Sequence, residues 1–114
     1  MITIDATNKK LGRVASIAAA ELLGKNSTTF TKNAVNRVHK VVITNASKID
    51  ISEKKLSEEV KKKYSGYPGG LTHESFKKIA QNKGYGELFK TAIYGMLPKN
   101  KLRKNIIQNL KVTE

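Results

Sequence analysis

An α/β fold is predicted by the order of the first three elements and by the lack of a hairpin signal between the strands. Ile2 and Ile4 alternate with Thr3, as in a strand, and a helical pattern and then a β-branched run follow. A strand, a helix and a strand in this order predict a right-handed crossover between two parallel strands. The 114 residues suffice for one hydrophobic core, so a single domain over residues 1–114 is expected.

Apolar residues at spacings of three and four predict the first helix. They are Leu11, Val14, Ala15, Ala18 and Leu22. The residues from Asp5 to Asn8 are of the types that cap a helix, so Asp5 is expected to serve the N-terminus of this one. Gly24, followed by Lys25, indicates its C-terminal end.

The next strand is indicated by Val38 and by the run Val41 to Ile43. Because this run is nearly continuous, it predicts a strand that is covered on both faces. Ile49 and Ile51 suggest a short extension. The pattern leaves open whether residues 53–63 are helical or extended.

Residues 60–64 favour an edge strand that lysines protect from pairing, and the segment SGYPGG (65–70) predicts a loop. Three helices follow in the prediction: one capped by Thr72, one ended by Pro98, and one that starts at Lys99. Their apolar positions are Phe76, Ile79 and Ala80, then Leu88, Thr91, Ala92 and Gly95, then Leu102, Ile106 and Leu110. Residues 110–112 are expected to become extended at the end of the last helix.

Composition indicates a polyanionic partner. The chain has 22 Lys and Arg against 9 Asp and Glu, a formal net charge of +13, and 39% hydrophobic residues, so it is basic and still able to fold. The absence of cysteine excludes disulfides, zinc fingers and thiol nucleophiles. No apolar run approaches the ~20 residues of a membrane span, and a secretory signal is not seen, so a soluble protein that works in the cytoplasm is expected.

A basic cluster at the C-terminal turn points to nucleic-acid binding. Lys99, Lys101, Arg103 and Lys104 follow a helix-ending Gly-Met-Leu-Pro, and on this prediction their charges lie near a helix N-terminus. The alternative is a solvated helix face that only keeps the protein soluble.

A second cluster begins the first helix. Lys9, Lys10 and Arg13 oppose the helix dipole unless an anion is bound there, and Gly12 beside them leaves room for close approach. Lysines tolerated at an exposed helix end explain the pattern equally well. In the SGYPGG segment, Tyr64 and Tyr67 could stack on unpaired bases or cap the core.

Signals for catalysis are weak. Gly84 and Gly86 lack the third glycine and the preceding strand of a dinucleotide-binding loop, and His39 and His73 lack metal-ligand spacing. Asp5 follows a strand, where α/β enzymes place catalytic groups, but capping explains it. The alternatives to a structural RNA-binding protein are a small nucleotide-using enzyme, with Asp5 or His73 catalytic, and a free-standing RNA-binding regulator.

Four ordered segments carry a family resemblance. They are IDATNKKLGRVAS (4–16), VVITNASKI (41–49), KKYSGYPGGL (62–71), and AIYGMLPKNKLRKN with LKV (92–112). In this order and combination the chain resembles the bacterial-type large-subunit ribosomal protein L13 family. The resemblance implies a three-layer α/β/α domain around a mostly parallel four-stranded sheet. It also implies a structural, non-enzymatic role in the large ribosomal subunit and in its assembly, without cofactor or metal.

The implied partners are large-subunit rRNA and neighbouring ribosomal proteins, with one copy per ribosome in the cytoplasm or in an organelle. Together, the clusters and the resemblance predict RNA contacts at Lys9, Lys10, Gly12, Arg13, Lys25, Lys32, Lys62, Lys63, Tyr64, Gly66, Tyr67, Gly69, Gly70, Gly95, Met96, Pro98, Lys99, Lys101, Arg103 and Lys104. The sequence lacks the family's usual N-terminal extension and C-terminal tail, and residues 30–35 depart from its Tyr-Thr-Pro-His-x-Asp segment. A trimmed member is therefore expected.

Overall fold

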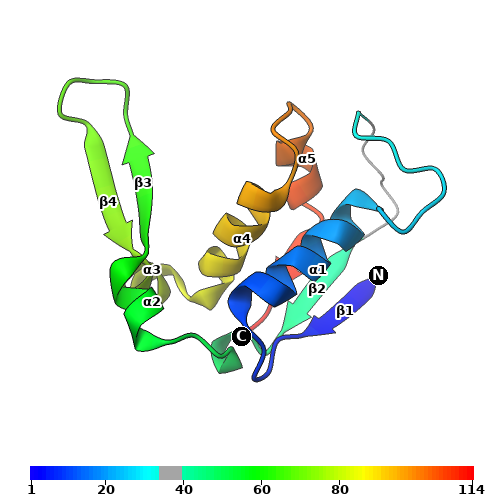
Figure 1. Ribbon diagram of the computed structural model, residues 1–114, viewed down its shortest axis with the longest axis horizontal. Coiled ribbons are helices and arrows are strands. Elements are labelled where there is room, and N and C mark those ends of the chain that lie inside the picture. Colours follow the sequence, from blue (N-terminus) through cyan, green and yellow to red (C-terminus); the bar gives the residue numbers. More distant parts are fainter. Residues whose placement is uncertain (34–39) are drawn as a thin grey trace.

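The computed structural model of the protein describes residues 1–33 and 40–114. The molecule is flat, with extents of 44 × 37 × 18 Å, and a β-hairpin projects from one side of it (Figure 1). Its radius of gyration is 14.9 Å. A compact chain of this length has a radius of about 13 Å, so part of this chain stands away from the core.

A parallel sheet forms one layer. Its strands are β1 (Ile2–Asp5), β2 (Val41–Thr44) and β5 (Leu110–Val112), in the order β1-β2-β5. The register pairs Ile4 with Ile43, and Ile43 with Val112. The predicted α/β class and parallel sheet are confirmed, but within the described residues the sheet has three strands instead of four.

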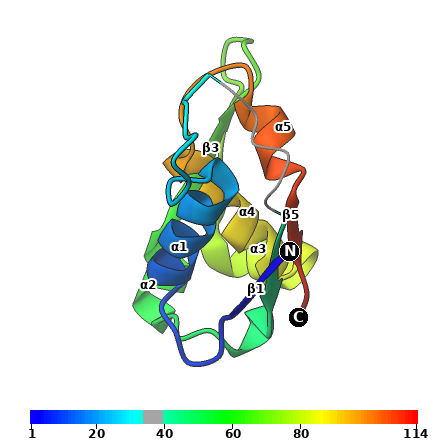
Figure 2. The ribbon, with the colours of Figure 1, turned by 90° about the vertical axis from the view of Figure 1, so that its right-hand side faces the viewer.

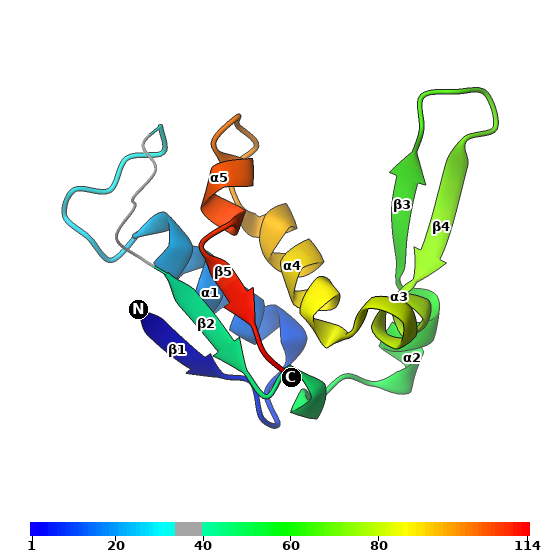
Figure 3. The ribbon, with the colours of Figure 1, turned by 180° about the vertical axis from the view of Figure 1, so that it is seen from behind.

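Helices α1 (Leu11–Leu23) and α4 (Tyr85–Met96) cover one face of this sheet (Figures 2 and 3). Val41 and Ile43 are buried beneath them, whereas Val42, on the other face, is only half-buried. The prediction that β2 is covered on both faces is therefore wrong. In the described ranges the second helical layer implied by the resemblance is not seen.

The first helix agrees with its predicted pattern, because all five stripe residues are buried. Gly24 ends α1 in a left-handed conformation, with φ of 67°, and its N–H closes the last turn. The start differs from the prediction. Lys10 occupies the N-cap position without a capping side chain, so the residues from Asp5 to Asn8 do not cap α1.

After β2 the chain forms a short 3-10 helix, η1 (Ala46–Lys48), and then α2 (Glu53–Glu58), which settles the open segment as helical in its first half. The predicted extension at Ile49 and Ile51 is not a strand; the backbone there makes one bridge, between Lys10 and Asp50. Val38 and His39 lie outside the described residues.

The hairpin consists of β3 (Val60–Tyr64) and β4 (Leu71–Ser75), which pair antiparallel and form a sheet of their own. The predicted strand at residues 60–64 is confirmed. Thr72 does not cap a helix, because it lies in β4 opposite Lys63. The cap of α3 (Phe76–Lys83) is Ser75, whose hydroxyl accepts a hydrogen bond from the Lys78 N–H.

Helix α4 ends at Met96, with Leu97 as its C-cap just before Pro98, as predicted. Its buried residues are Leu88, Phe89 and Ile93, while Gly95, which was predicted on the apolar face, is exposed. Helix α5 (Arg103–Ile107) is shorter than predicted at both ends. Residues 99–102 form a turn before it, and the expected extended end is confirmed as β5.

None of the described helices combines the length and apolarity that crossing a membrane would require.

Candidate nucleic-acid interface

Three segments that are far apart in the sequence lie at the same end of the molecule. Figure 1 shows the segment after α1, the hairpin tip and the turn before α5 all at the top, and Figures 2 and 3 agree. We call residues 25–33, 62–70 and 95–104 the loop end. It contains no Asp or Glu, and its cations are Lys25, Lys32, Lys62, Lys63, Lys99, Lys101, Arg103 and Lys104.

The acidic residues belong to other parts of the fold. Most lie at the end of β1, in and before α2, at the base of the hairpin and in the first turn of α4; they include Asp5, Asp50, Glu53, Glu58, Glu59, Glu74 and Glu87. The ion pairs of the described chain are Lys10–Asp50, Lys55–Glu59, Lys61–Glu87 and Lys83–Glu74. Within that part of the chain no loop-end cation is paired, so their charges add without compensation.

The turn before α5 forms a basic hollow of about 530 Å³. It is lined by Tyr94, Lys99, Asn100, Lys101, Arg103 and Lys104. The Asn100 amide donates to the Lys32 backbone carbonyl at 3.1 Å, which joins this turn to the segment after α1. Met96 is exposed and Pro98 half-buried beside it. The prediction that the four cations lie together is confirmed, but the sequence did not indicate that Tyr94 and Asn100 line the same hollow.

At the hairpin tip the two tyrosines point away from the core. Tyr64 is 65% exposed and Tyr67 is 76% exposed, so the alternative that they cap the core is wrong. Gly66 and Gly69 have φ of 89° and 73°, which favours glycine, and a Cβ on Gly70 would lie 3.0 Å from the Tyr67 backbone oxygen and would displace the Ser65 hydroxyl. These three glycines are thus required by the loop itself, which presents the tyrosines.

A further basic hollow, of about 710 Å³, lies between the hairpin and α3. Its lining residues are Lys61, Lys62, Lys63, Thr72, His73, Glu74, Lys78 and Lys83. Lys78 and Lys83 were not predicted, because only the fold brings α3 beside the strand lysines. His73 is an exposed strand residue in it, and no group suited to metal binding occurs among the described residues.

The cluster at the start of α1 lies at the opposite end of that helix from the loop end (Figure 1). Lys10 forms an ion pair with Asp50, and Lys9 and Arg13 are exposed. A hollow of about 540 Å³ there is lined by Lys10, Gly12, Arg13, Ser16 and Lys55. No acid occurs in the first turn of α1, so its free N–H groups and these cations attract an anion together. The predicted residues therefore form two separate surfaces.

Asp5 has a structural role. Its Oδ1 accepts hydrogen bonds from the Asn45 amide at 3.0 Å, from the Thr7 hydroxyl at 2.7 Å and from the Thr7 N–H at 3.1 Å. These bonds, with the charge of Lys9, lower the pKa of Asp5 to about 2. The carboxylate therefore holds the end of β1 against the end of β2, where Asn45 adopts a left-handed conformation.

The lowered pKa of Asp5 predicts a pH-dependent contribution to stability. Because the pKa is lower in the folded protein than in the unfolded chain, the stabilisation is present above about pH 4 and is lost as the pH falls through about 2. Asp5→Asn is expected to lower the Tm at pH 7, and the difference from wild type should vanish near pH 2. Thermal unfolding across this pH range checks it; a constant difference would contradict it.

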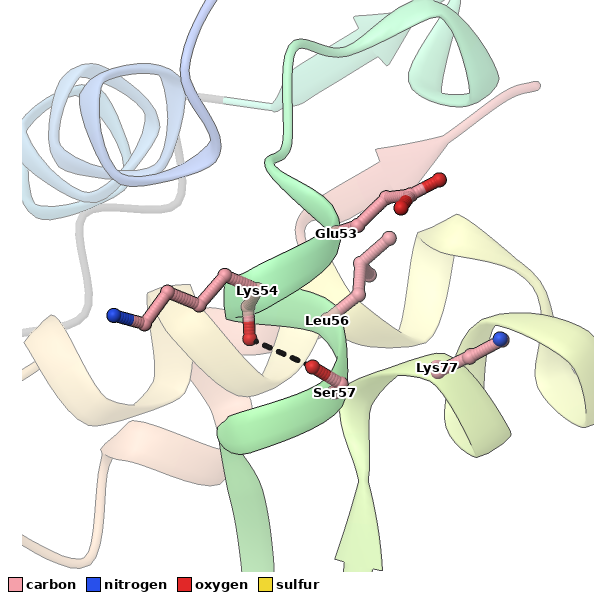
Figure 4. A pocket seen from close by; sticks show the side chains of 5 residues that line it. All are labelled: Glu53, Lys54, Leu56, Ser57 and Lys77. Carbon is pink, nitrogen blue, oxygen red and sulfur yellow. Dashed lines mark hydrogen bonds between the residues drawn. The ribbon is translucent and has the colours of Figure 1, made fainter.

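A hollow between α2 and α3 lacks the features of a site. Figure 4 shows the Lys54 side chain pointing to the side opposite to those of Glu53 and Lys77, and the Ser57 hydroxyl donates to the Lys54 carbonyl at 3.1 Å. Since no polar groups converge there, it does not compete with the loop end as a binding surface.

Comparison with known proteins points to one family. The family described as "Ribosomal protein L13" matches residues 1–114. The "Large ribosomal subunit protein uL13" of Caldanaerobacter subterraneus subsp. tengcongensis is 44% identical over 109 residues, which is 96% of this chain and 75% of that protein. The protein of the same name from Geobacter sp. (strain M21) is 43% identical, and the "Large ribosomal subunit protein uL13c" of Gracilaria tenuistipitata var. liui is 38% identical, each over the same shares.

Proposed function

Because this chain belongs to the ribosomal protein L13 family, it is a structural, non-enzymatic constituent of the large ribosomal subunit, and we propose that its loop end binds rRNA. Binding of rRNA is the general role of the family. The observation that carries the proposal is the gathering, from three distant segments, of unpaired cations without any acid.

The contacts at the loop end are mainly to phosphates and sugars. Exposed lysines neutralise phosphates and release counterions, which supplies affinity without reading the sequence. The exposed rings of Tyr64 and Tyr67 offer flat apolar faces on which unpaired bases stack. Charge therefore provides attraction, and the shape of the loop end selects the RNA fold that fits.

The cluster at the start of α1 serves as a second anchor. This cluster, with Lys9, Gly12 and Arg13, lies at the other end of α1 from the loop end. A single RNA segment would have to run along the protein to contact both surfaces. We infer that the protein holds two rRNA segments together as the subunit assembles. It does so as a single domain and as one copy, beside neighbouring ribosomal proteins.

Lysine reactivity tests the assignment. Acetylation of the free protein and of its complex with protein-free large-subunit rRNA is compared by mass spectrometry. Lys25, Lys32, Lys63, Lys99 and Lys101 are expected to lose reactivity at least severalfold in the complex. Three exposed lysines away from both surfaces, Lys54, Lys77 and Lys111, serve as controls and should stay reactive.

Two outcomes would contradict the proposal. Equal protection of the control lysines would mean that binding is diffuse, and unchanged loop-end lysines would mean that another surface binds RNA. Sedimentation distinguishes this function from that of a free-standing regulator. A structural constituent stays with large subunits in stoichiometric amount through a high-salt wash, whereas a regulator is released.

A further inference from the structure

Arg103 differs from the other cations of the loop end because its side chain is held in place. Its guanidinium carbon lies 3.9 Å from the centroid of the Tyr94 ring. At this distance the ring face attracts the planar cation. The neighbouring lysines are exposed and have no such support in the described structure.

Among the described residues, Nε of Arg103 is a hydrogen-bond donor without an acceptor. This nitrogen is buried, and the guanidinium takes part in no ion pair within that part of the chain. A buried donor without a partner is costly, so such a group in a folded protein calls for an explanation. Nε itself has almost no accessible surface, so a ligand in the hollow would accept hydrogen bonds from the outer nitrogens of this half-buried guanidinium.

The surroundings define the chemistry of that ligand. The hollow around Arg103 is lined by three lysines and Asn100, and it contains no acid. The Asn100 side-chain oxygen accepts from the Leu102 N–H at 3.1 Å while its amide holds the Lys32 carbonyl, so the turn is fixed by both ends of one side chain. A planar, immobilised guanidinium matches the two oxygens of a phosphodiester.

We propose that Arg103 and the turn around it form a preformed site for one phosphodiester of the RNA, and that Tyr94 is its positioning residue. This inference rests on the proposed function, since it names the group on the RNA that the hollow accepts. Tyr94 acts by holding the guanidinium flat before the RNA arrives, which lowers the entropy lost on binding. The surrounding lysines reach the flanking phosphates.

The test measures affinity of the full chain for protein-free large-subunit rRNA across a KCl series. Arg103→Lys keeps the charge but loses the planar fork, and Tyr94→Leu removes the ring face. Each is expected to weaken binding roughly threefold to tenfold with an unchanged salt slope. Tyr94→Phe retains the ring face and should bind within about twofold of wild type.

The double variant separates positioning from general packing. If Tyr94 acts through Arg103, then Tyr94→Leu combined with Arg103→Lys binds no more weakly than Arg103→Lys alone. The inference would be overturned if the losses of affinity of the two single variants multiplied in the double variant. It would also be overturned if Tyr94→Leu or Arg103→Lys bound with wild-type affinity. Should Tyr94→Leu fail to fold by circular dichroism, Arg103→Lys against Tyr94→Phe still decides it. A wild-type protein without salt-dependent binding would instead refute the proposed function.

Discussion

Replacing Lys101, Arg103 and Lys104 by alanine is expected to reduce rRNA affinity by more than an order of magnitude at moderate salt. Each cation that neutralises a phosphate contributes about 0.7 to 0.9 to the slope of log affinity against log salt, so the slope should fall by roughly 2. The fold should be retained, because Lys101 and Lys104 are exposed and Arg103 is only half-buried. Filter binding across a salt series measures both quantities.

A matched control removes the same charge elsewhere. Lys54, Lys77 and Lys111 are exposed, and none of them lines the hollow at the C-terminal turn or the hollow at the start of α1. Their joint replacement by alanine lowers the net charge equally, and we expect a loss of affinity of only a few fold. If both triple variants lost affinity to the same extent, net charge alone would explain binding, and the assignment of contacts to the C-terminal turn would be wrong.

Local sequence patterns were sufficient to predict strands β1 and β2 and the helix α1 between them. The stripe from Leu11 to Leu22 has one interpretation, because a helix is the only element that places those residues on one face. The prediction that α1 ends at Gly24 is confirmed, and Gly24 adopts the left-handed conformation expected of a glycine at a helix end. The strand–helix–strand order then required parallel strands, as observed.

Errors arose where tertiary context decides the structure. Thr72 and Ser75 are both good capping residues, and the pairing of Thr72 with Lys63 in the hairpin selected Ser75. The helix predicted from Lys99 was too long at both ends: residues 99–102 form a turn, and Leu110 is used in β5 beside Val41. The spacing of Leu102, Ile106 and Leu110 fits a helix, and the sheet overrides it.

The sequence predicted which segments of the binding surface are basic, but not how their side chains are arranged in space. Clustered cations are visible in the sequence, and the structure places four of them around one hollow. Whether a cation is unpaired depends on residues far along the chain: Lys10 meets Asp50, a pairing that no local pattern indicates. Tyr94 and Lys55 join the surfaces for the same reason, through helix packing that brings separate segments together.

Two glycines within helices have no explanation among the described residues. A Cβ on Gly12 in α1 or on Gly95 in α4 would meet no atom within 4 Å, and neither residue has a positive φ. Glycine in the middle of a helix is less stable than alanine by about 0.5–1 kcal/mol, and the difference is smaller at Gly12 and Gly95, which lie in the first turn of α1 and the last turn of α4. Since no contact among the described residues requires glycine there, we infer that a partner approaches closely at both positions, which lie in the two proposed RNA-binding surfaces.

Gly12→Ala and Gly95→Ala are therefore expected to change stability and binding in opposite directions. Each should raise the free energy of unfolding by a few tenths of a kcal/mol, because alanine favours the helix and both positions lie in a terminal turn. Each should weaken rRNA binding roughly five- to hundredfold, since an added methyl group in a close contact costs ~1–3 kcal/mol. Gly86→Ala is the control: its Cβ would make an ordinary contact with Val112 at 3.6 Å, so rRNA affinity should not change. Denaturant unfolding and filter binding on the same preparations give both quantities. Unchanged affinity in the Gly12 and Gly95 variants would mean that RNA does not approach these helices closely, and the two-anchor arrangement would then lack its steric basis.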